Sequence, residues 1–230
     1  MNEAYNSAIT SLDIGLVGRN IGISKRLSSL ILSHFDREGH FLDYGGGYGM
    51  LVRIMRDCGF DFHRFDTYCE NIFARHFDLH DSSVRKFELL TAFELFEHLE
   101  NPVEELEKML EFSDSIFFST ELVPARKLTS ARDWWYFTPE TGQHIALYSE
   151  RSLDTLARKF GCNFYTDGRT LHLITRRRIN PSLFRLSLNP KVAQLVTKVR
   201  SQKSLLSNDF DFIRNSIRGN ENSLRSSDIQ

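Results

Sequence analysis

Three side chains with acid–base or metal-binding chemistry lie close together in the segment TAFELFEHLENP. Glu94, Glu97 and His98 stand at positions i, i+3 and i+4, which puts them on one side of the chain if this segment turns helical. A fourth group, His144, follows in the segment TGQHIALYS. Carboxylates and imidazoles take protons from hydroxyl groups and bind divalent metal ions. The spacing therefore predicts a catalytic or metal-binding group made of these four residues.

A second group occurs earlier, in the stretch DYGGGYG. Asp43 is followed by Gly45, Gly47 and Gly49, and Asp66 comes about twenty residues later. A glycine-rich turn between a strand and a helix lets a ligand approach the backbone, with the helix N-terminus facing it. A carboxylate at the end of the next strand can hold two ribose hydroxyls. The dinucleotide fingerprint GxGxxG fits in neither register, so the turn indicates another nucleotide-like ligand, with an ordinary tight connection as the alternative.

Alternating strands and helices are predicted to position both groups. Periodicity predicts strands over residues 40–44, 60–66, 87–93 and 115–123, and helices over residues 18–35, 50–60, 67–77, 101–112 and 150–161. Residues 162–178 are expected to form a closing hairpin around Asp167 and Gly168. The segment 77–86 is too short for a further full strand. The alternation predicts an α/β fold, with a central, mostly parallel sheet flanked by helices.

The composition of the chain changes near Arg178. Beyond it, apolar residues thin out, Ser and Asn increase, and Pro181 and Pro190 interrupt two short amphipathic stretches. We therefore expect one domain over residues 1–178 and a helical, partly disordered extension over residues 179–230. Such an extension is a candidate contact for a homo-oligomer or a biosynthetic complex.

The overall composition argues against several classes of protein. The 230 residues carry a formal net charge of -1 with a pI of about 6.7, so no global field favours nucleic acid or an anionic membrane. The three cysteines are widely spaced, which argues against a disulfide framework or a zinc cluster. No apolar run reaches the length of a membrane span, and the N-terminus lacks the pattern of a signal peptide. These features predict a cytoplasmic protein.

Taken together, the glycine turn, the later aspartate and the EH segment resemble class I S-adenosylmethionine-dependent methyltransferases. TAFELFEHLENP is similar to the signature EVxEHxxDP of ubiquinone-type and related bacterial enzymes. Residues 15–178, with the stretches FLDYGGGYGMLVRIMRDCGFDFHRFD and WWYFTPETGQHIALYS, look like a bacterial subgroup associated with polysaccharide and glycan biosynthesis. The resemblance implies a Rossmann-like fold and S-adenosylmethionine as cofactor. It implies a cofactor site lined by Asp43, Gly45, Gly47, Gly49, Asp66 and Glu94.

The leading hypothesis is O-methylation of a sugar or glycan intermediate, with the acceptor hydroxyl beside Glu97, His98 and His144. The pattern ExxEH with a later histidine is also similar to metal-dependent small-RNA and ubiquinone O-methyltransferases, so these three residues and Glu94 are candidate ligands for Mg²⁺ or Mn²⁺. Without a metal, His144 or His98 is the candidate general base. The alternatives are 2′-O-methylation of an RNA end, which the balanced charge disfavours, and a non-catalytic scaffold that keeps the fold.

An aromatic cluster lies between the EH segment and His144 in the sequence. Trp134, Trp135 and Tyr136 are a candidate platform on which a sugar ring or nucleobase stacks, with residues 139–142 as a candidate lid. Their alternative role is packing in the core or at an interface.

Overall fold

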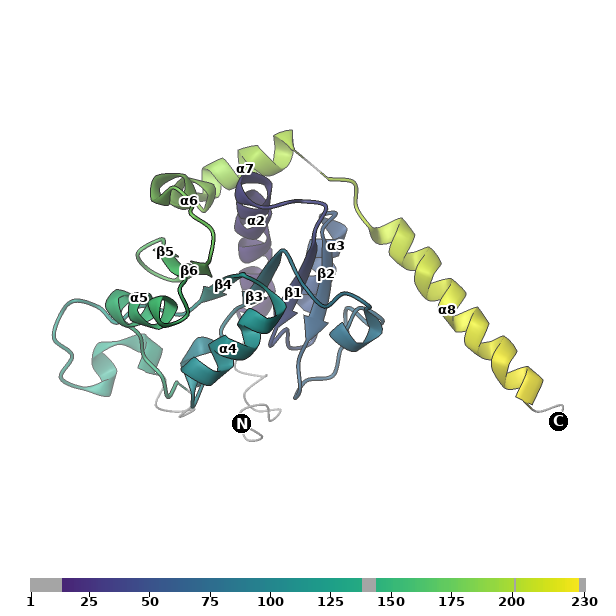
Figure 1. The fold of residues 1–230 in the computed structure, drawn as a ribbon, viewed down its shortest axis with the longest axis horizontal. Helices are drawn as coiled ribbons and strands as arrows, with labels where there is room; N and C mark the ends of the chain where they lie inside the picture. Colours follow the sequence, from purple (N-terminus) through teal and green to yellow (C-terminus); the bar gives the residue numbers. More distant parts are fainter. Residues whose placement is uncertain (1–13, 138–143, 201, 228–230) are drawn as a thin grey trace.

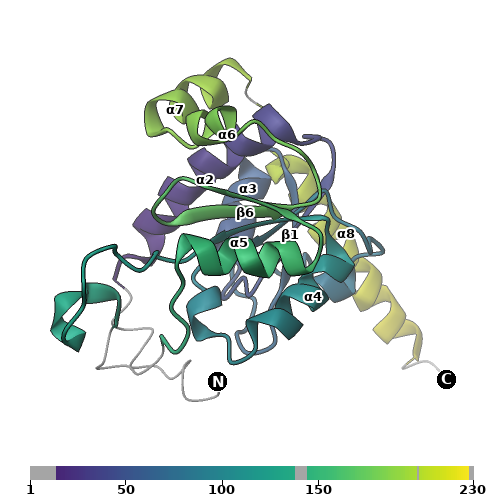
Figure 2. The same cartoon turned by 60° about the vertical axis from the view of Figure 1, so that its left-hand side comes forward.

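The computed structural model describes residues 14–137, 144–200 and 202–227 of the chain. Figures 1 and 2 show one central sheet with helices on both sides and a long helix that extends away from it at the C-terminus. The candidate lid at residues 139–142 lies outside the described residues.

The sheet has six strands in the order β2-β1-β3-β4-β6-β5. Their bounds are β1 His40–Tyr44, β2 Asp61–Phe65, β3 Leu89–Ala92, β4 Ser115–Ser119, β5 Asn163–Thr166 and β6 Leu171–Thr175. The first four strands are parallel, whereas β6 runs antiparallel to both β4 and β5. The predicted α/β architecture with a mostly parallel sheet and a closing hairpin is therefore confirmed. Because β2, β1, β3 and β4 are parallel, the loops that follow them gather at one edge.

The helices follow the predicted alternation, with short 3-10 turns in the loops. Their bounds are α2 Leu16–His34, α3 Met50–Asp57, α4 Pro102–Phe112, α5 Glu150–Lys159, α6 Pro181–Ser187, α7 Pro190–Val199 and α8 Leu206–Ser227. The 3-10 turns cover Leu79–Asp81, Phe96–His98, Ala131–Asp133 and Trp135–Phe137. Side chains fix helix starts: Asn101 accepts from the Glu104 amide before α4, and Ser149 accepts from the Ser152 amide before α5.

Apolar side chains cover both faces of the sheet. Ile116 and Phe118 of β4 pack on the side of α4 and α5, whereas Phe117 between them packs on the side of α2 and α3. This alternation follows from the two-residue period of a strand. Phe96, in the turn after β3, stacks on Phe118 with ring centroids 4.0 Å apart. The turn that carries Glu97 and His98 is thus anchored in the core.

The prediction of a helix over residues 67–77 is wrong: this segment consists of bends and turns. The Asn71 side chain accepts a hydrogen bond from the Ala74 amide and donates one to the Ala74 carbonyl. These bonds replace helical backbone bonds, which is how asparagine commonly favours turns. His76 also has a positive φ of 72°, which a continuing helix cannot contain. As predicted, the segment 77–86 adds no full strand, only a bridge between Arg64 and Asp78.

The C-terminal extension contains α6, α7 and α8. Phe184 of α6 and Ala193 of α7 are buried, and both helices pack beside α2. The domain boundary near Arg178 and the partial disorder of the extension stay predictions, and residues 228–230 lie outside the described part of the chain. Among the described helices, none is both long and apolar enough to cross a membrane.

Candidate functional site

The glycine turn joins the end of β1 to the start of α3. Gly45, Gly47 and Gly49 have φ values of +70°, +52° and +83°, a region that other L residues rarely adopt. A Cβ atom on Gly47 would meet no atom within 4 Å, so this part of the turn faces open space. A Cβ atom on Gly49 would instead lie 2.6 Å from Asn71 Oδ1. Gly47 therefore leaves room for a ligand, whereas Gly49 allows the turn to pack closely against Asn71.

Asp66, directly after β2, holds the turn from the side. Its Oδ2 atom accepts from the Gly47 amide at 2.9 Å, and its Oδ1 atom accepts from the amides of Tyr68 and Cys69 at 2.8 Å each. The carboxylate is half-buried and lies against the glycine turn, as the sequence spacing predicts. Asp66 thus has a structural role in the turn in addition to its proposed ligand role.

Asp43 lies beneath the turn on β1 and is buried. Its Oδ1 atom accepts from the Thr91 hydroxyl of β3 at 2.6 Å. Burial raises the pKa of Asp43 to about 7; the Thr91 hydrogen bond opposes this rise, and the charge of Asp66 adds to it. The side chain therefore carries a proton over a pH range in which an exposed aspartate is ionised.

The raised pKa of Asp43 predicts a pH dependence of stability. The unfolded chain releases this proton near the ordinary value of 3.8, whereas the folded chain keeps it up to about 7. The free energy of unfolding should therefore fall as pH rises through this window and then level off, by at most about 4 kcal/mol. Asp43→Asn should remove this part of the slope, which urea unfolding at several pH values measures. An unchanged slope in Asp43→Asn, relative to wild type and to the exposed control Asp114→Asn, would contradict the assignment.

Arg64 is a buried cation that the sequence analysis missed. Its Nε atom donates to the Gly47 carbonyl at 2.6 Å, and its guanidinium also donates to the Cys69 carbonyl and to Asp78. One side chain thus connects the glycine turn to the loop after β2. The alternation of the strand could have indicated that Arg64 is buried. Phe60, Phe62 and Arg64 lie two residues apart, so Arg64 falls on the buried face, where an apolar residue is expected.

Glu97 is a fully buried carboxylate in the 3-10 turn after β3. Neither of its oxygens has a well-formed hydrogen bond among the described residues. Burial, followed by the charge of Glu94, raises the pKa of Glu97 to about 8, which the nearby hydroxyls of Tyr136 and Thr120 partly offset. A buried carboxylate without firm partners is costly, so its position calls for a proton or a cation nearby.

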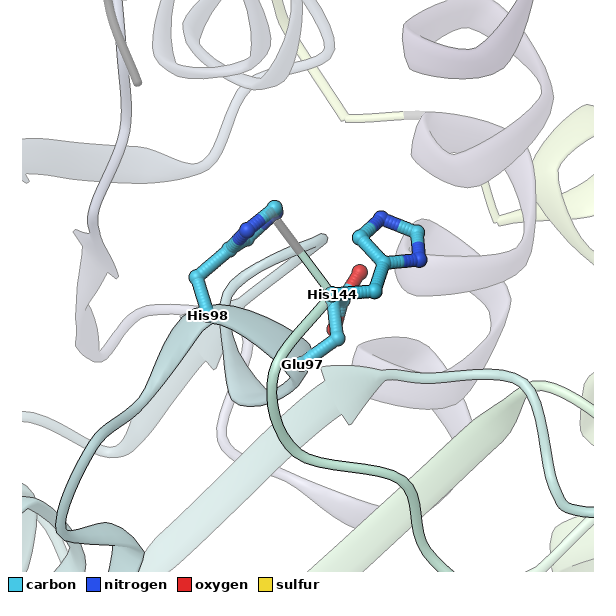
Figure 3. A group of neighbouring side chains, drawn as sticks. All are labelled: Glu97, His98 and His144. Atoms are coloured by element: carbon cyan, nitrogen blue, oxygen red, sulfur yellow. The ribbon is translucent and has the colours of Figure 1, made fainter. Parts of the chain in front are cut away.

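His98 and His144 meet beside this carboxylate. The amides of Ile145 and Ala146 donate to the Glu97 backbone carbonyl at 2.9 and 3.0 Å, which ties the later loop to the turn. The two imidazole rings have centroids 5.1 Å apart in an edge-to-face arrangement, and Figure 3 shows the Glu97 side chain beside them. One possible ligand atom from each of the three residues lies within 4.8 Å of the others.

The orientation of the His144 ring determines the role of its nitrogens. Its Nδ1 atom lies 2.6 Å from the Tyr136 backbone carbonyl. A carbonyl only accepts hydrogen bonds, so Nδ1 carries the proton, and in the neutral ring Nε2 has its lone pair free. That atom can accept a proton from a hydroxyl or bind a metal ion.

The structure does not bring Glu94 into this group. Its φ of +50° turns the chain before the 3-10 turn begins, so the predicted helical spacing to Glu97 does not form. Its Oε1 atom accepts from the Ser119 hydroxyl at 2.7 Å, and Ser119 also accepts from the Glu94 amide at 2.8 Å. Glu94 is exposed beside the turn, close enough for its charge to raise the pKa of Glu97.

The aromatic cluster divides into buried and exposed members. Trp134 and Tyr136 are buried, with 6 and 2% of their surface exposed, whereas Trp135 is 67% exposed. The Tyr136 ring lies 4.3 Å from the His144 ring, between centroids. Trp135 is therefore the member free to stack with a ligand, and the other two support the histidine loop.

The two groups lie at the same edge of the sheet. β1 and β3 are neighbouring parallel strands, and the glycine turn follows one while the Glu97 turn follows the other. A Cβ atom on Gly45 would lie 3.3 Å from the side chain of Leu95, which directly precedes the Glu97 turn. A ligand on the glycine turn would thus be next to the carboxylate and imidazoles.

Comparisons with known proteins show the family and the fold of the chain. A family model described as a methyltransferase domain matches residues 21–166. A comparison with curated proteins gave no match. The fold is similar to the plantazolicin methyltransferase BpumL in complex with S-adenosylhomocysteine (SAH), with 13% identity, a TM-score of 0.52 and coverage of 76% of this chain and 93% of that chain.

Two further solved structures also match this chain at low identity. BpumL in complex with a monoazolic desmethylPZN analog and SAH is 14% identical, with a TM-score of 0.52 and coverage of 86% of this chain and 88% of that chain. The mitomycin 7-O-methyltransferase MmcR is 13% identical, with a TM-score of 0.48 and coverage of 75% of this chain and 59% of that chain.

Proposed function

The chain belongs to the methyltransferase domain family. We propose that it transfers the methyl group of S-adenosylmethionine to a hydroxyl of a sugar or glycan intermediate. The observation that carries the proposal is the placement of an open glycine turn next to the Glu97, His98 and His144 group at one sheet edge. Glu97 is fully buried there and has no well-formed hydrogen bond among the described residues, an arrangement that a scaffold without activity does not require.

The glycine turn fits the cofactor. Gly47 leaves open space where any other residue would place a side chain, and Asp66 lies beside it. We propose that Asp66 binds the ribose hydroxyls and that the backbone of the turn binds the rest of the ligand. Arg64 holds the turn through the Gly47 carbonyl, and Asp43 lies below it, bound to Thr91. When bound, S-adenosylmethionine supplies a methyl group on a positively charged sulfur.

The histidine group provides a way to activate the acceptor. In methyl transfer to an alcohol, the oxygen–methyl bond forms as the sulfur–methyl bond breaks, and the hydroxyl loses its proton. We assign that proton to Nε2 of His144, because Nδ1 is already bound to the Tyr136 carbonyl. His98 and Glu97 line the same space, and the second product is SAH. Holding the hydroxyl in line with the methyl group is the remaining task of the pocket.

A divalent cation is the second candidate for activating the hydroxyl, because neither oxygen of Glu97 has a well-formed hydrogen bond among the described residues. Glu97, His98 and His144 would hold it, and the His144 Nδ1 bond to a backbone carbonyl is a common support for a metal-binding imidazole. Two imidazoles with one carboxylate suit a transition metal such as Mn²⁺ better than Mg²⁺. Such an ion makes a bound hydroxyl more acidic.

Chelation separates these two mechanisms. Protein treated with EDTA and then dialysed should keep full activity if His144 acts alone as base, and should lose activity that Mn²⁺ restores if a cation is required. Thermal unfolding with added Mn²⁺ gives a readout that needs no acceptor. A stabilisation seen in wild type and absent in Glu97→Gln assigns the metal to this group.

Exposed Trp135 supports a ring-shaped acceptor and gives a testable prediction. Trp135→Ala should raise the KM for the acceptor about tenfold, equivalent to about 1.4 kcal/mol, because a stacking surface is lost. Thermal stability should stay close to wild type, since the side chain is 67% exposed. Trp134→Ala is the contrasting variant, because loss of that buried ring should destabilise the fold by about 3 kcal/mol or more. Steady-state kinetics that show an unchanged KM in Trp135→Ala would remove the platform from the proposal.

The reaction itself is tested by transfer of a labelled methyl group. Purified protein is incubated with methyl-labelled S-adenosylmethionine and a panel of nucleotide sugars and glycan termini, with Gly47→Ala as the cofactor-deficient control. Label in an oxygen–methyl group of a sugar, located by NMR, supports the proposal. Label found only on nitrogen or carbon atoms contradicts O-methylation, and label found only in RNA contradicts the sugar acceptor.

A further inference from the structure

The layer formed by α2, α6 and α7 carries positive formal charge only. The sequence has no Asp or Glu over residues 14–35, which include α2, or over residues 168–208, which include α6 and α7. The three helices pack on one another, and Figures 1 and 2 show α6 and α7 together on the outer side of α2. Because the whole chain has a net charge of -1, the rest of the chain carries a compensating acidic excess. The near-neutral total therefore combines a cationic layer with an acidic remainder.

The cations of this layer are available to a ligand. Those with exposed side chains are Lys25, Arg185, Lys191, Lys198 and Arg200. None of them forms an ion pair with a described residue, since Arg185 and Arg200 donate to the backbone carbonyls of Thr166 and Leu32. Lys25 and Arg200 also line one cavity of about 220 Å³ between α2 and α7. The described part of the chain thus leaves this positive charge without a counter-charge.

The outward face of α7 combines lysines with exposed apolar side chains. Lys191, Leu195 and Lys198 stand at i, i+4 and i+7, which places them on one face of the helix, with Val199 beside them. Leu195 and Val199 are 62 and 73% exposed, whereas Ala193 on the other face is fully buried. This face therefore offers both charge and apolar area to a partner.

The neighbouring helix α6 adds two exposed leucines. Leu183 and Leu186 are 55 and 51% exposed, whereas Phe184 between them is fully buried in the core. The side chains of Asn180 and Asn189 accept hydrogen bonds from the first amides of α6 and α7, so both helices are capped within this chain. Exposed aliphatic side chains grouped on two short, capped helices indicate an interaction surface.

An anionic membrane surface matches both the charge and the apolar side chains. Aliphatic side chains enter the boundary between lipid headgroups and acyl chains, and lysines extend their long side chains to the phosphates. Nucleic acid would use the lysines alone, because none of the three helices exposes a Phe, Tyr or Trp on which bases could stack. We propose that α2, α6 and α7 dock this protein on an anionic membrane surface, with Leu195 and Val199 inserted between the headgroups.

Sedimentation of the full-length protein with lipid vesicles tests the docking. Wild type should bind vesicles that contain phosphatidylglycerol, should bind pure phosphatidylcholine vesicles weakly, and should leave the anionic vesicles as salt is raised. The double variant Lys191→Gln, Lys198→Gln should have a partition coefficient about 25-fold lower, or about fivefold for each charge. The double variant Lys86→Gln, Lys159→Gln removes the same net charge at two exposed positions elsewhere and should bind like wild type. Absence of wild-type binding, or an equal loss in both double variants, overturns the proposal.

A single leucine tests the insertion. Leu195→Ser should lower the partition coefficient about tenfold, because less apolar area enters the lipid. Leu206→Ser on α8, where the side chain is 58% exposed, is the matched control and should bind like wild type. Circular dichroism of both variants should equal that of wild type, since both side chains are largely exposed. Full binding by Leu195→Ser contradicts the insertion.

Two other ligands separate the membrane from other anionic partners. A short RNA duplex and polyglutamate are titrated into the same wild-type protein, and neither should bind as tightly as the anionic vesicles. Tight binding of either ligand by a protein that ignores the vesicles overturns the membrane proposal. Vesicle binding needs neither S-adenosylmethionine nor an acceptor, so its failure is distinct from failure of the proposed reaction.

Discussion

Gly47→Ala should abolish detectable SAH binding and leave the fold intact. A Cβ atom at this position meets no protein atom within 4 Å, so the substitution costs only the strain of a positive φ, about 1 kcal/mol. The added methyl group instead enters the space that we assign to the cofactor. The dissociation constant should rise about 100-fold or more, equivalent to about 3 kcal/mol, which calorimetric titration measures.

Gly49→Ala is the matched variant of the same turn. It should lower the stability of the fold, whereas Gly47→Ala should weaken SAH binding. Its Cβ atom would lie 2.6 Å from Asn71 Oδ1 and 3.2 Å from the Ala74 amide nitrogen, and Asn71 is held in place by its own hydrogen bonds. Strain and overpacking together should lower the stability by about 3 kcal/mol, or roughly 10 °C in Tm. Equal melting temperatures for the two variants would contradict the tight packing at Gly49. Normal SAH binding by Gly47→Ala would show that the turn does not hold the ligand as proposed.

His144→Ala should lower kcat by about 100-fold to 10,000-fold without weakening SAH binding. The physical reason is that Nε2 of His144 carries a lone pair beside Glu97 and His98, whereas we assign the cofactor to the glycine turn. Single-turnover kinetics with the acceptor found in the labelling experiment separate the chemical step from binding.

His40→Ala is the control for removal of an imidazole. His40 lies at the start of β1, away from the loops that follow the parallel strands, and its Nδ1 atom pairs with Asp61 at 2.7 Å. It should keep wild-type kcat. A His144→Ala variant with full kcat would remove this residue from the reaction and leave a role in loop structure alone.

The glycine turn was predictable because its determinants are local. A buried strand, closely spaced glycines and an amphipathic helix follow one another in the sequence, and each has a distinct composition. The position of Asp66 was predictable for the same reason, since it directly ends the next strand. Local chemistry also explains the one helix that failed: Asn71 side-chain bonds at the start of the segment replace the backbone bonds that a helix needs.

The composition of the Glu97 group was only partly predictable. Glu97 and His98 are neighbours in sequence, but His144 reaches them through backbone bonds from Ile145 and Ala146 to the Glu97 carbonyl. Glu94 was expected in the same group from helical spacing, yet its positive φ changes the direction of the chain. Such long-range bonds and single-residue conformations depend on packing that periodicity does not describe.

Asp66 is best tested with a substitution that preserves its size, because its carboxylate accepts bonds from three backbone amides. Calorimetric titration of SAH into wild type, Asp66→Asn and the exposed control Asp114→Asn tests whether the glycine turn and Asp66 form the cofactor site. We expect one SAH bound per chain in wild type and control, and binding about 100-fold weaker in Asp66→Asn. Absence of SAH binding in all three folded proteins, or equal affinity in all three, would contradict it.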